Sequence, residues 1–299
     1  MTDSKKLKSS HKVNGLLQKE ADSHRIFDFV QYTDYLAAIY AELKNQLSSY
    51  SYLQFAEDLG FPRSNALWLI ISGRRKLSPK AAERILKSIP LKSMQRRYFL
   101  AMVRHNNANQ GREREKFLQD LIEIKAQVIP DHEDRERLEY FSEWYYPVIR
   151  EMVGTTWFQS DPQWIAEQLF MKIMPKQAGY ALDLLERLNL ISWDVSKGRH
   201  VLTGGQVHPT REVGPIAAIR YHEKMCEIAR DSVTRVPSSL RDLNALTVRL
   251  KPEDAARVKA RLIELCHEVF AMEAASQGSE DENVYQVNMQ LFPLVVPKK

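Results

Sequence analysis

One short stretch of the chain, residues 62–79, combines side chains that could contact a nucleic acid. It runs PRSNALWLIISGRRKLSP: a polar cluster, a dense apolar run, a glycine and three consecutive cations. Asparagine can pair with adenine through two hydrogen bonds, serine can contact bases or phosphates, and arginine favours guanine or phosphate. These residue types therefore suit contacts with base edges and with a phosphate backbone.

A helical period divides this stretch into an inner and an outer side. With Leu67, Ile70 and Ile71 facing a core, the polar residues at the start lie on the outer side. We therefore expect DNA contacts from Arg63, Ser64, Asn65, Trp68, Arg74, Arg75 and Lys76. The indole of Trp68 could instead pack partly against a neighbouring helix, and the cations at 74–76 could form a solvated turn.

Two short helices are predicted to hold these residues in place. In SYLQFAEDLG, Ser51 can cap the first helix, Ala56 is small enough for a close helix approach, and Gly60 ends it. The second helix is predicted at residues 64–72. Two helices joined by a turn that contains glycine form a helix-turn-helix unit, whose second helix lies in the major groove.

Further helices are predicted around this unit, at residues 32–47, 79–89 and 93–105. Ser78 and Pro79 form a suitable N-cap and first-turn pair for the helix at 79–89. Residues 26–105 are therefore expected to be a helix-turn-helix DNA-binding domain. Residues 1–25 lack periodic apolar spacing and carry five lysines, so we expect a flexible basic arm.

The charge is unevenly distributed along the chain. Residues 1–110 hold 18 Lys or Arg against 9 Asp or Glu, whereas the remainder holds 25 against 29. Residues 61–104 alone hold eleven cations and one carboxylate, Glu83. A field of one sign can attract a polyanion, although a solvated basic surface would have the same composition.

The stretch NNANQG, residues 106–111, has the composition of a linker. Two longer helical patterns follow at 112–129 and 134–153, and Pro147 should kink the second or lie near its start. We interpret residues 106–154 as a linker with connecting helices.

Residues 155–207 show two helical patterns and then two short strands around a turn with Gly198, the layout of a winged helix. Secondary DNA contacts could come from Lys176, Gln177, Tyr180, Lys197 and Arg199. However, the charges of this region balance, and Asp183 and Glu186 lie on the helix that would face phosphates. The pattern favours a protein-contact or dimerisation role here.

Residues 208–299 are predicted to form a C-terminal dimerisation or effector domain of the α+β class. A helix at 214–233 precedes the alternating segment LNALTVRL, a cationic amphipathic helix at 252–275 and the alternating segment VYQVNMQLF. A strand, a helix and a strand of these lengths suit a right-handed strand-helix-strand unit.

Catalytic and metal-binding patterns are absent from the sequence. It has no GxxxxGK, GxSxG or HExxH, and the pair His222 and Cys226 lacks a second pair at zinc-like spacing. We therefore expect no enzyme, no cofactor and no metal. Two cysteines inside helical patterns, and no apolar run long enough for a bilayer, predict a cytoplasmic protein without a membrane partner.

Two resemblances follow from these motifs. SYLQFAEDLGF with ALWLIISGRRKLSPKAAERI resembles the helix-turn-helix of phage-repressor-like (Cro/cI-like) regulators. Together with YFSEWYYPVIREMV, SSLRDLNALTVRL and VYQVNMQLFPL, it resembles a bacterial family of largely uncharacterised regulators that join such a unit to a C-terminal domain of unknown function. The resemblance covers nearly everything after residue 27 and implies DNA-binding transcriptional control.

The sequence thus predicts a mainly α protein with small β elements: an N-terminal helix-turn-helix bundle, a central winged helix and a C-terminal α+β domain. The expected function is sequence-specific regulation of transcription by a homodimer on double-stranded DNA, with an effector or protein partner of unknown identity. The alternative is a signalling adaptor that uses the same folds to bind protein partners or an anionic small ligand.

Overall fold

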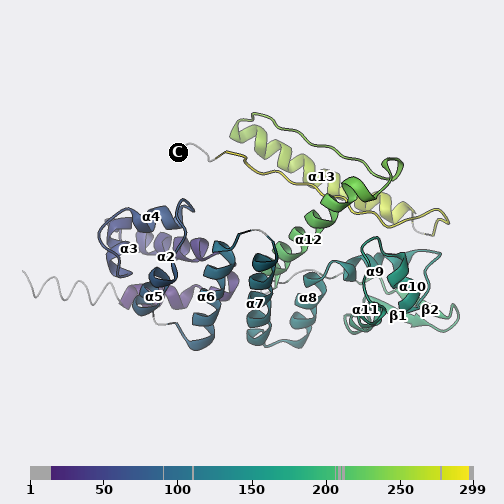
Figure 1. Cartoon of the computed structure of the whole chain (residues 1–299), viewed down its shortest axis with the longest axis horizontal. Helices are drawn as coiled ribbons and strands as arrows, with labels where there is room; N and C mark the ends of the chain where they lie inside the picture. Colours follow the sequence, from purple (N-terminus) through teal and green to yellow (C-terminus); the bar gives the residue numbers. More distant parts are fainter. Residues whose placement is uncertain are drawn as a thin grey trace, which may run out of the picture. The chain divides into compact units, whose positions relative to one another are not determined.

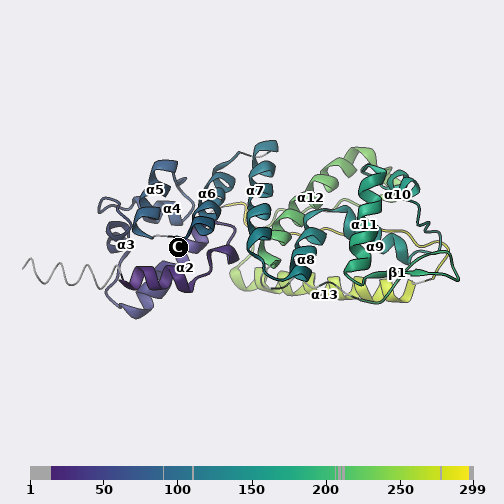
Figure 2. The ribbon, with the colours of Figure 1, turned by 90° about the horizontal axis from the view of Figure 1, so that it is seen from below.

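The computed structural model describes residues 15–89, 91–109, 111–205, 207, 210, 213–276 and 278–295. The protein is mainly helical, as the sequence predicts, and its described part contains one small two-stranded sheet (Figure 1 and Figure 2). The chain divides into two compact units. Unit 1 is Met1–Leu138 with Pro209–Ala218, and unit 2 is Glu139–His208 with Ile219–Lys299.

Unit 1 contains each helix that the sequence predicts between residues 32 and 105, followed by a further long helix. After a short 3₁₀ turn, η1 (Ile26–Asp28), the helices are α2 (Tyr32–Gln46), α3 (Tyr52–Asp58), α4 (Ala66–Ile71), α5 (Pro79–Ser88), α6 (Ser93–Asn107) and α7 (Arg112–Val128). The helix α4 packs against α2 and α3, while α6 packs against α5 and α7.

The predicted ends of α3 and the predicted start of α5 are confirmed. The Ser51 hydroxyl accepts a hydrogen bond from the Gln54 N–H at 3.3 Å, and the Ser78 hydroxyl accepts one from the Ala81 N–H at 3.2 Å. Gly60 lies just beyond α3 with a φ of 77°, a conformation that glycine adopts without steric cost. The small side chain of Ala56 is fully buried, which allows close packing of the helices.

The N-terminal segment differs from the expected arm. Residues 15–23 are helical, and the side chains of Leu17 and Ala21, four residues apart, are buried. Glu20 is also buried, where its carboxylate accepts a hydrogen bond from Gln46 at 2.9 Å. Burial of these apolar residues at helical spacing packs the segment against unit 1, so the flexible arm is not seen from residue 15 onward. Residues 1–14 of the predicted arm lie outside the described residues.

The segment predicted as a linker begins with two asparagines that hold unit 1 together. The Asn106 side chain accepts a hydrogen bond from the Tyr32 N–H at 3.0 Å, and the Asn107 side chain donates one to the Leu77 carbonyl at 2.7 Å. The Tyr32 hydroxyl in turn accepts one from the Leu77 N–H at 3.1 Å. Polar composition alone does not separate a linker from a set of hydrogen bonds between distant loops.

A buried lysine joins α7 to the start of unit 1. Lys125 is 1% exposed, and its ammonium group donates a hydrogen bond to the Phe27 carbonyl at 2.6 Å and lies 3.9 Å from the Asp28 carboxylate. A buried cation is retained only where such acceptors compensate for lost hydration. The helix α7 is therefore part of unit 1 rather than a connector beside it.

Unit 2 begins near the end of α8 (His132–Ser142) and continues through α9 (Tyr145–Gly154), α10 (Pro162–Gln168), α11 (Pro175–Arg187), β1 (Ile191–Asp194) and β2 (Arg199–Leu202). The long helix predicted at 134–153 is thus two helices. Pro147 lies in the first turn of α9, where its missing N–H is not needed.

The helices α9, α10 and α11 and the hairpin share one core. Ile149, Ile165, Ala178 and Leu185 are among its buried residues. The strands pair antiparallel, with Ile191 opposite Leu202. Two helices followed by a hairpin reproduce the order predicted for a winged helix.

The C-terminal part of unit 2 differs from the predicted strand-helix-strand unit. It contains most of α12 (Gly214–Arg235), a 3₁₀ turn, η2 (Ser238–Leu240), and α13 (Pro252–Ser276). The segments 241–250 and 284–292 are extended, but within the described chain neither is paired in a sheet, so the predicted strands are wrong (Figure 1). Alternating residues determine which face each side chain takes, whereas a strand also needs a hydrogen-bonded neighbour.

Candidate nucleic-acid interface

The N-terminal end of α4 presents the polar residues predicted to contact bases. Asn65 is the N-cap residue and is exposed, and its side chain forms no capping hydrogen bond. The hydroxyl of Ser64 accepts a hydrogen bond from the Ala66 N–H at 3.3 Å, so Ser64 supports the helix start. Arg63 is exposed immediately before it. The Asn65 amide and the Arg63 guanidinium therefore face solvent at the same helix end.

The burial of the apolar residues of α4 agrees closely with the prediction. Leu67 and Ile70 are buried, while Ile71, also expected in the core, is half-buried. Trp68 is half-buried, and the Arg74 guanidinium carbon lies 4.9 Å from the centre of its ring. A cation above an indole face is attracted to it. Trp68 therefore packs in part and supports Arg74, rather than projecting fully into solvent.

The C-terminal end of α4 is closed by the backbone of the following basic residues. Gly73 has a φ of 71°, and the N–H groups of Arg74 and Arg75 donate hydrogen bonds to the Leu69 carbonyl at 2.9 and 3.0 Å. This arrangement satisfies a carbonyl that the helix end leaves without a partner. The side chains of Arg74 and Arg75 remain exposed, whereas the Lys76 ammonium group donates to the Asn107 carbonyl at 2.6 Å.

The seven predicted contact residues thus lie on one short segment, at either end of α4 or within it. Arg63 and Asn65 are exposed at one end, Arg74 and Arg75 are exposed at the other, and Ser64, Trp68 and Lys76 also take part in local contacts.

The exposed cations extend beyond this segment. All eleven cations of residues 61–104 are exposed, and we call them the basic surface: Arg63, Arg74, Arg75, Lys76, Lys80, Arg84, Lys87, Lys92, Arg96, Arg97 and Arg104. Within the described chain, ion pairs from this set join Arg96 to Glu83 at 2.5 Å and Arg104 to Asp120 at 3.7 Å. Most of the positive charge is therefore not neutralised locally.

One part of the basic surface was not assigned from the sequence. Lys80, Arg84 and Lys87 are exposed on α5, opposite the buried residues Ala82 and Ile85. Their spacing of four and three residues places them on one side of the helix. This spacing is visible in the sequence and could have identified the cationic side of α5, which we add to the candidate interface.

The secondary contacts predicted in unit 2 are divided between exposed and structural residues. Lys176 and Tyr180 are exposed on α11. The Gln177 side chain accepts a hydrogen bond from the Met174 N–H at 2.9 Å, and the Arg199 guanidinium donates one to the Thr155 carbonyl at 2.8 Å. Gln177 and Arg199 therefore stabilise unit 2 itself.

The turn of the hairpin carries a carboxylate beside its cation. Asp194 lies 4.0 Å from the ammonium group of Lys197. Hydrogen bonds from the Ser196 hydroxyl and from the Lys197 N–H lower the pKa of Asp194. Asp183 and Glu186 are also exposed on α11. This mixture of signs is unfavourable for a surface that faces phosphates.

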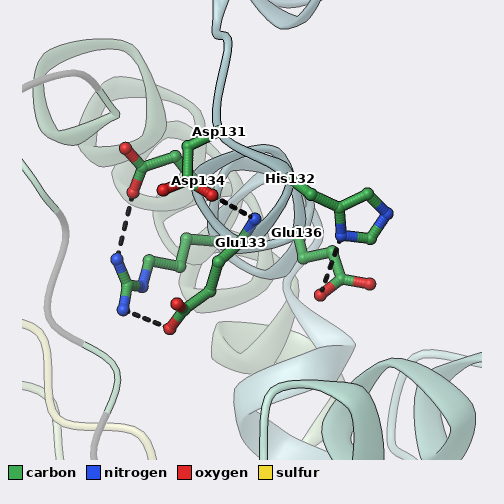
Figure 3. A network of polar contacts seen from close by, with 6 residues as sticks. Asp131, His132, Glu133, Asp134 and Glu136 are labelled. Atoms are coloured by element: carbon green, nitrogen blue, oxygen red, sulfur yellow. Dashed lines mark hydrogen bonds and ion pairs between the residues drawn. The ribbon is translucent and has the colours of Figure 1, made fainter.

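A separate acidic cluster at the start of α8 has a structural explanation (Figure 3). The Asp131 carboxylate accepts a hydrogen bond from the Glu133 N–H at 2.9 Å, and the Arg137 guanidinium binds both Glu133 and Asp134. His132 lies 3.7 Å from Glu136. Carboxylates at this position stabilise the positive end of a helix. No group of His, Cys, Asp and Glu among the described residues is arranged to hold a metal ion.

The fold and the basic surface define the class: a mainly helical protein whose N-terminal unit exposes a concentration of cations. Residues 125–294, more than half of the chain, match the family described as a domain of unknown function (DUF4423), and the chain belongs to this family. The match begins within α7 and so does not include α4 or α5. No curated protein and no solved structure matches the chain. None of the described helices is both long enough and apolar enough for a membrane span.

Proposed function

We propose that the protein is a sequence-specific DNA-binding regulator of transcription that acts as a homodimer in the cytoplasm. In this proposal α3 and α4 form the helix-turn-helix unit, and α4 enters the major groove. Regulation results from binding alone, without a catalytic step, cofactor or metal ion.

The observation that carries the proposal is the position of Asn65. Its exposed amide lies at the start of α4 and is not used to cap the helix. Asparagine at the start of a recognition helix can form two hydrogen bonds to adenine. A residue with only a capping role would instead accept a hydrogen bond from the first turn.

The basic surface supplies the affinity in this proposal. Arg74 and Arg75 follow α4, and Lys80, Arg84 and Lys87 project from the next helix. Phosphate contacts fix the orientation of a protein on DNA, whereas base contacts select the sequence. The two sets of residues therefore predict two separable effects on binding.

The test is to replace Asn65 with alanine and compare the DNA sequences selected from a random double-stranded pool. We expect the Asn65→Ala variant to lose discrimination at one base position by about 1–3 kcal/mol, because two hydrogen bonds to that base disappear. Its salt dependence should be unchanged. The matched control is Asn109→Ala, which removes the same amide from an exposed asparagine elsewhere in unit 1.

Identical sequence preferences for the wild-type protein and both variants would contradict a reading role for Asn65. Failure of the wild-type protein to bind any duplex DNA would contradict the proposal as a whole. It would favour the alternative, a signalling adaptor that binds protein partners or an anionic small ligand.

A further inference from the structure

The C-terminal part of unit 2 carries many large apolar side chains that its own fold does not bury. After Met225, none of the described residues up to Val295 is buried. Large apolar side chains are nevertheless frequent there: Leu246 is 90% exposed, Phe270 is 69% exposed and Tyr285 is 72% exposed. Monomeric soluble proteins rarely expose an apolar region of this extent, so a partner surface is missing from the single chain.

The extended segment after α13 lies with its polar side against α12. The Asn288 side chain donates a hydrogen bond to the Met225 carbonyl at 3.2 Å, and the Gln286 side chain accepts one from the Tyr221 hydroxyl at 3.3 Å. The alternate residues Tyr285 and Val287 are exposed on the other side. These two hydrogen bonds use the polar side of the segment, whereas Tyr285 and Val287 remain exposed.

The helix α13 carries an apolar stripe with coiled-coil spacing. Val258, Leu262, Leu265, Val269 and Met272 follow one another at alternating intervals of four and three residues. None of these side chains is buried. Intervals of four and three residues keep a stripe facing a second helix along its whole length.

A surface groove lies along part of this stripe. Its lining includes Val258, Leu262 and Leu265, together with Arg257, Arg261 and Glu268. An apolar floor with charged edges is the usual arrangement at a helix-helix seam.

The charges beside the stripe change sign around Leu262 and Ile263. Arg257 and Arg261 precede these two residues, whereas Glu264 and Glu268 follow them. In an antiparallel pair of α13 helices centred between Leu262 and Ile263, position 257 lies opposite 268 and position 261 lies opposite 264. Each arginine would then face a glutamate. A centre one residue further along, between Ile263 and Glu264, places Leu262 opposite Leu265.

The charges thus specify the partner. Both the charged pairs and the apolar pairs come from one helix, as a self-complementary interface with two-fold symmetry requires. An anionic membrane surface would instead favour cations along the whole stripe. Among the described residues, the same arginines form ion pairs with Asp254 and Glu264 at the surface, which are worth little in water and can be exchanged.

We propose that α13 forms an antiparallel two-fold seam with α13 of a second copy of this chain, and that this seam is the dimer interface. The inference deepens the dimeric part of the proposed function and rests on that part alone, since it requires no DNA.

The experiment reverses the charges on either side of the seam in the full-length protein. One variant carries Arg257→Glu and Arg261→Glu, and the other carries Glu264→Lys and Glu268→Lys. In each variant alone, charges of the same sign would meet across the seam. We expect the dissociation constant of each homodimer to rise by at least about 100-fold in sedimentation experiments without DNA.

Mixing the two variants restores opposite charges across the seam. We expect heterodimers with a dissociation constant close to that of the wild-type homodimer, measured by native mass spectrometry with one copy carrying a mass tag. The control reverses Arg230 and Arg235, two exposed arginines at the end of α12, and should dimerise as the wild-type protein does. Circular dichroism checks that every variant keeps its helical content.

A monomeric wild-type protein, dimers that survive either charge reversal, or failure of the mixed variants to associate would each overturn the proposal. None of these measurements involves DNA, so the result is distinguishable from a failure of the DNA-binding function.

Discussion

The pair Arg74 and Arg75 offers the sharpest test of how the basic surface acts. Both side chains are exposed just after α4, and no described carboxylate forms an ion pair with either. If both contact phosphates, each releases counterions on binding, and each contributes about 0.9 to the slope of log affinity against log salt. The double change Arg74→Ala and Arg75→Ala should reduce that slope by about 1.8 for each bound protomer, or about 3.6 for a dimer.

The effect on folding should be small by comparison. The Arg74 guanidinium lies 4.9 Å from the Trp68 ring centre, and an exposed contact of this kind contributes about 0.5–1 kcal/mol. The backbone N–H groups of both residues keep their hydrogen bonds to Leu69 after the change. Loss of DNA affinity in the double variant would therefore result from lost charge rather than from unfolding.

The assay is fluorescence anisotropy on one duplex at a series of salt concentrations. The matched control removes two exposed arginines from α12 in unit 2, through Arg230→Ala and Arg235→Ala, with the same change in net charge. The control should keep the wild-type slope. An unchanged slope in the Arg74 and Arg75 variant, or an equal reduction in the control, would refute the argument that these cations contact the backbone.

Two further predictions concern backbone conformation and titration. Gly73→Ala should lower the free energy of unfolding of unit 1 by about 1–2 kcal/mol in urea denaturation, because its φ is 71° although a Cβ there would meet nothing within 4 Å. Gly15→Ala, where a Cβ also meets nothing and φ is ordinary, is the control and should not destabilise the protein. In unit 2, burial raises the pKa of Glu151 above 4.5, against the opposing effect of Arg150 and with support from a hydrogen bond to Glu273. A carboxyl with a raised folded pKa stabilises the protein below its unfolded pKa and loses that contribution as pH rises through the folded value. The thermal midpoint of Glu151→Gln should therefore exceed that of wild type at neutral pH, with the difference shrinking towards pH 4.5; a constant difference across this range would contradict the assignment.

The sequence was most informative about the local structure of unit 1. Helical spacing located α2 to α6, and the residue types at Ser51 and Ser78 identified the starts of α3 and α5. These features depend on interactions within a few residues, so periodicity and capping chemistry are sufficient to predict them.

The candidate interface could be predicted only in part. The exposure of Asn65 followed from the helical period of the stretch at 62–79, and that of Arg74 and Arg75 followed from the run of cations after the helix. The position of the Arg74 guanidinium over Trp68 did not follow, because it depends on the turn that Gly73 makes after the helix. The contact between Lys76 and Asn107 joins residues far apart in the chain and has no local signature.

By itself, the sequence determined most of the helices, the caps of α3 and α5, the uneven charge and the alternation of the C-terminal segments. Only the tertiary structure decided that Asn106 and Asn107 join loops of unit 1, that Lys125 is buried, and that the alternating segments beside α13 lack strand partners. The physical reason is the range of the interactions. A helix closes its hydrogen bonds within four residues, whereas a strand, a buried cation or a side-chain clamp needs partners that only the folded chain, or a second copy of it, can supply.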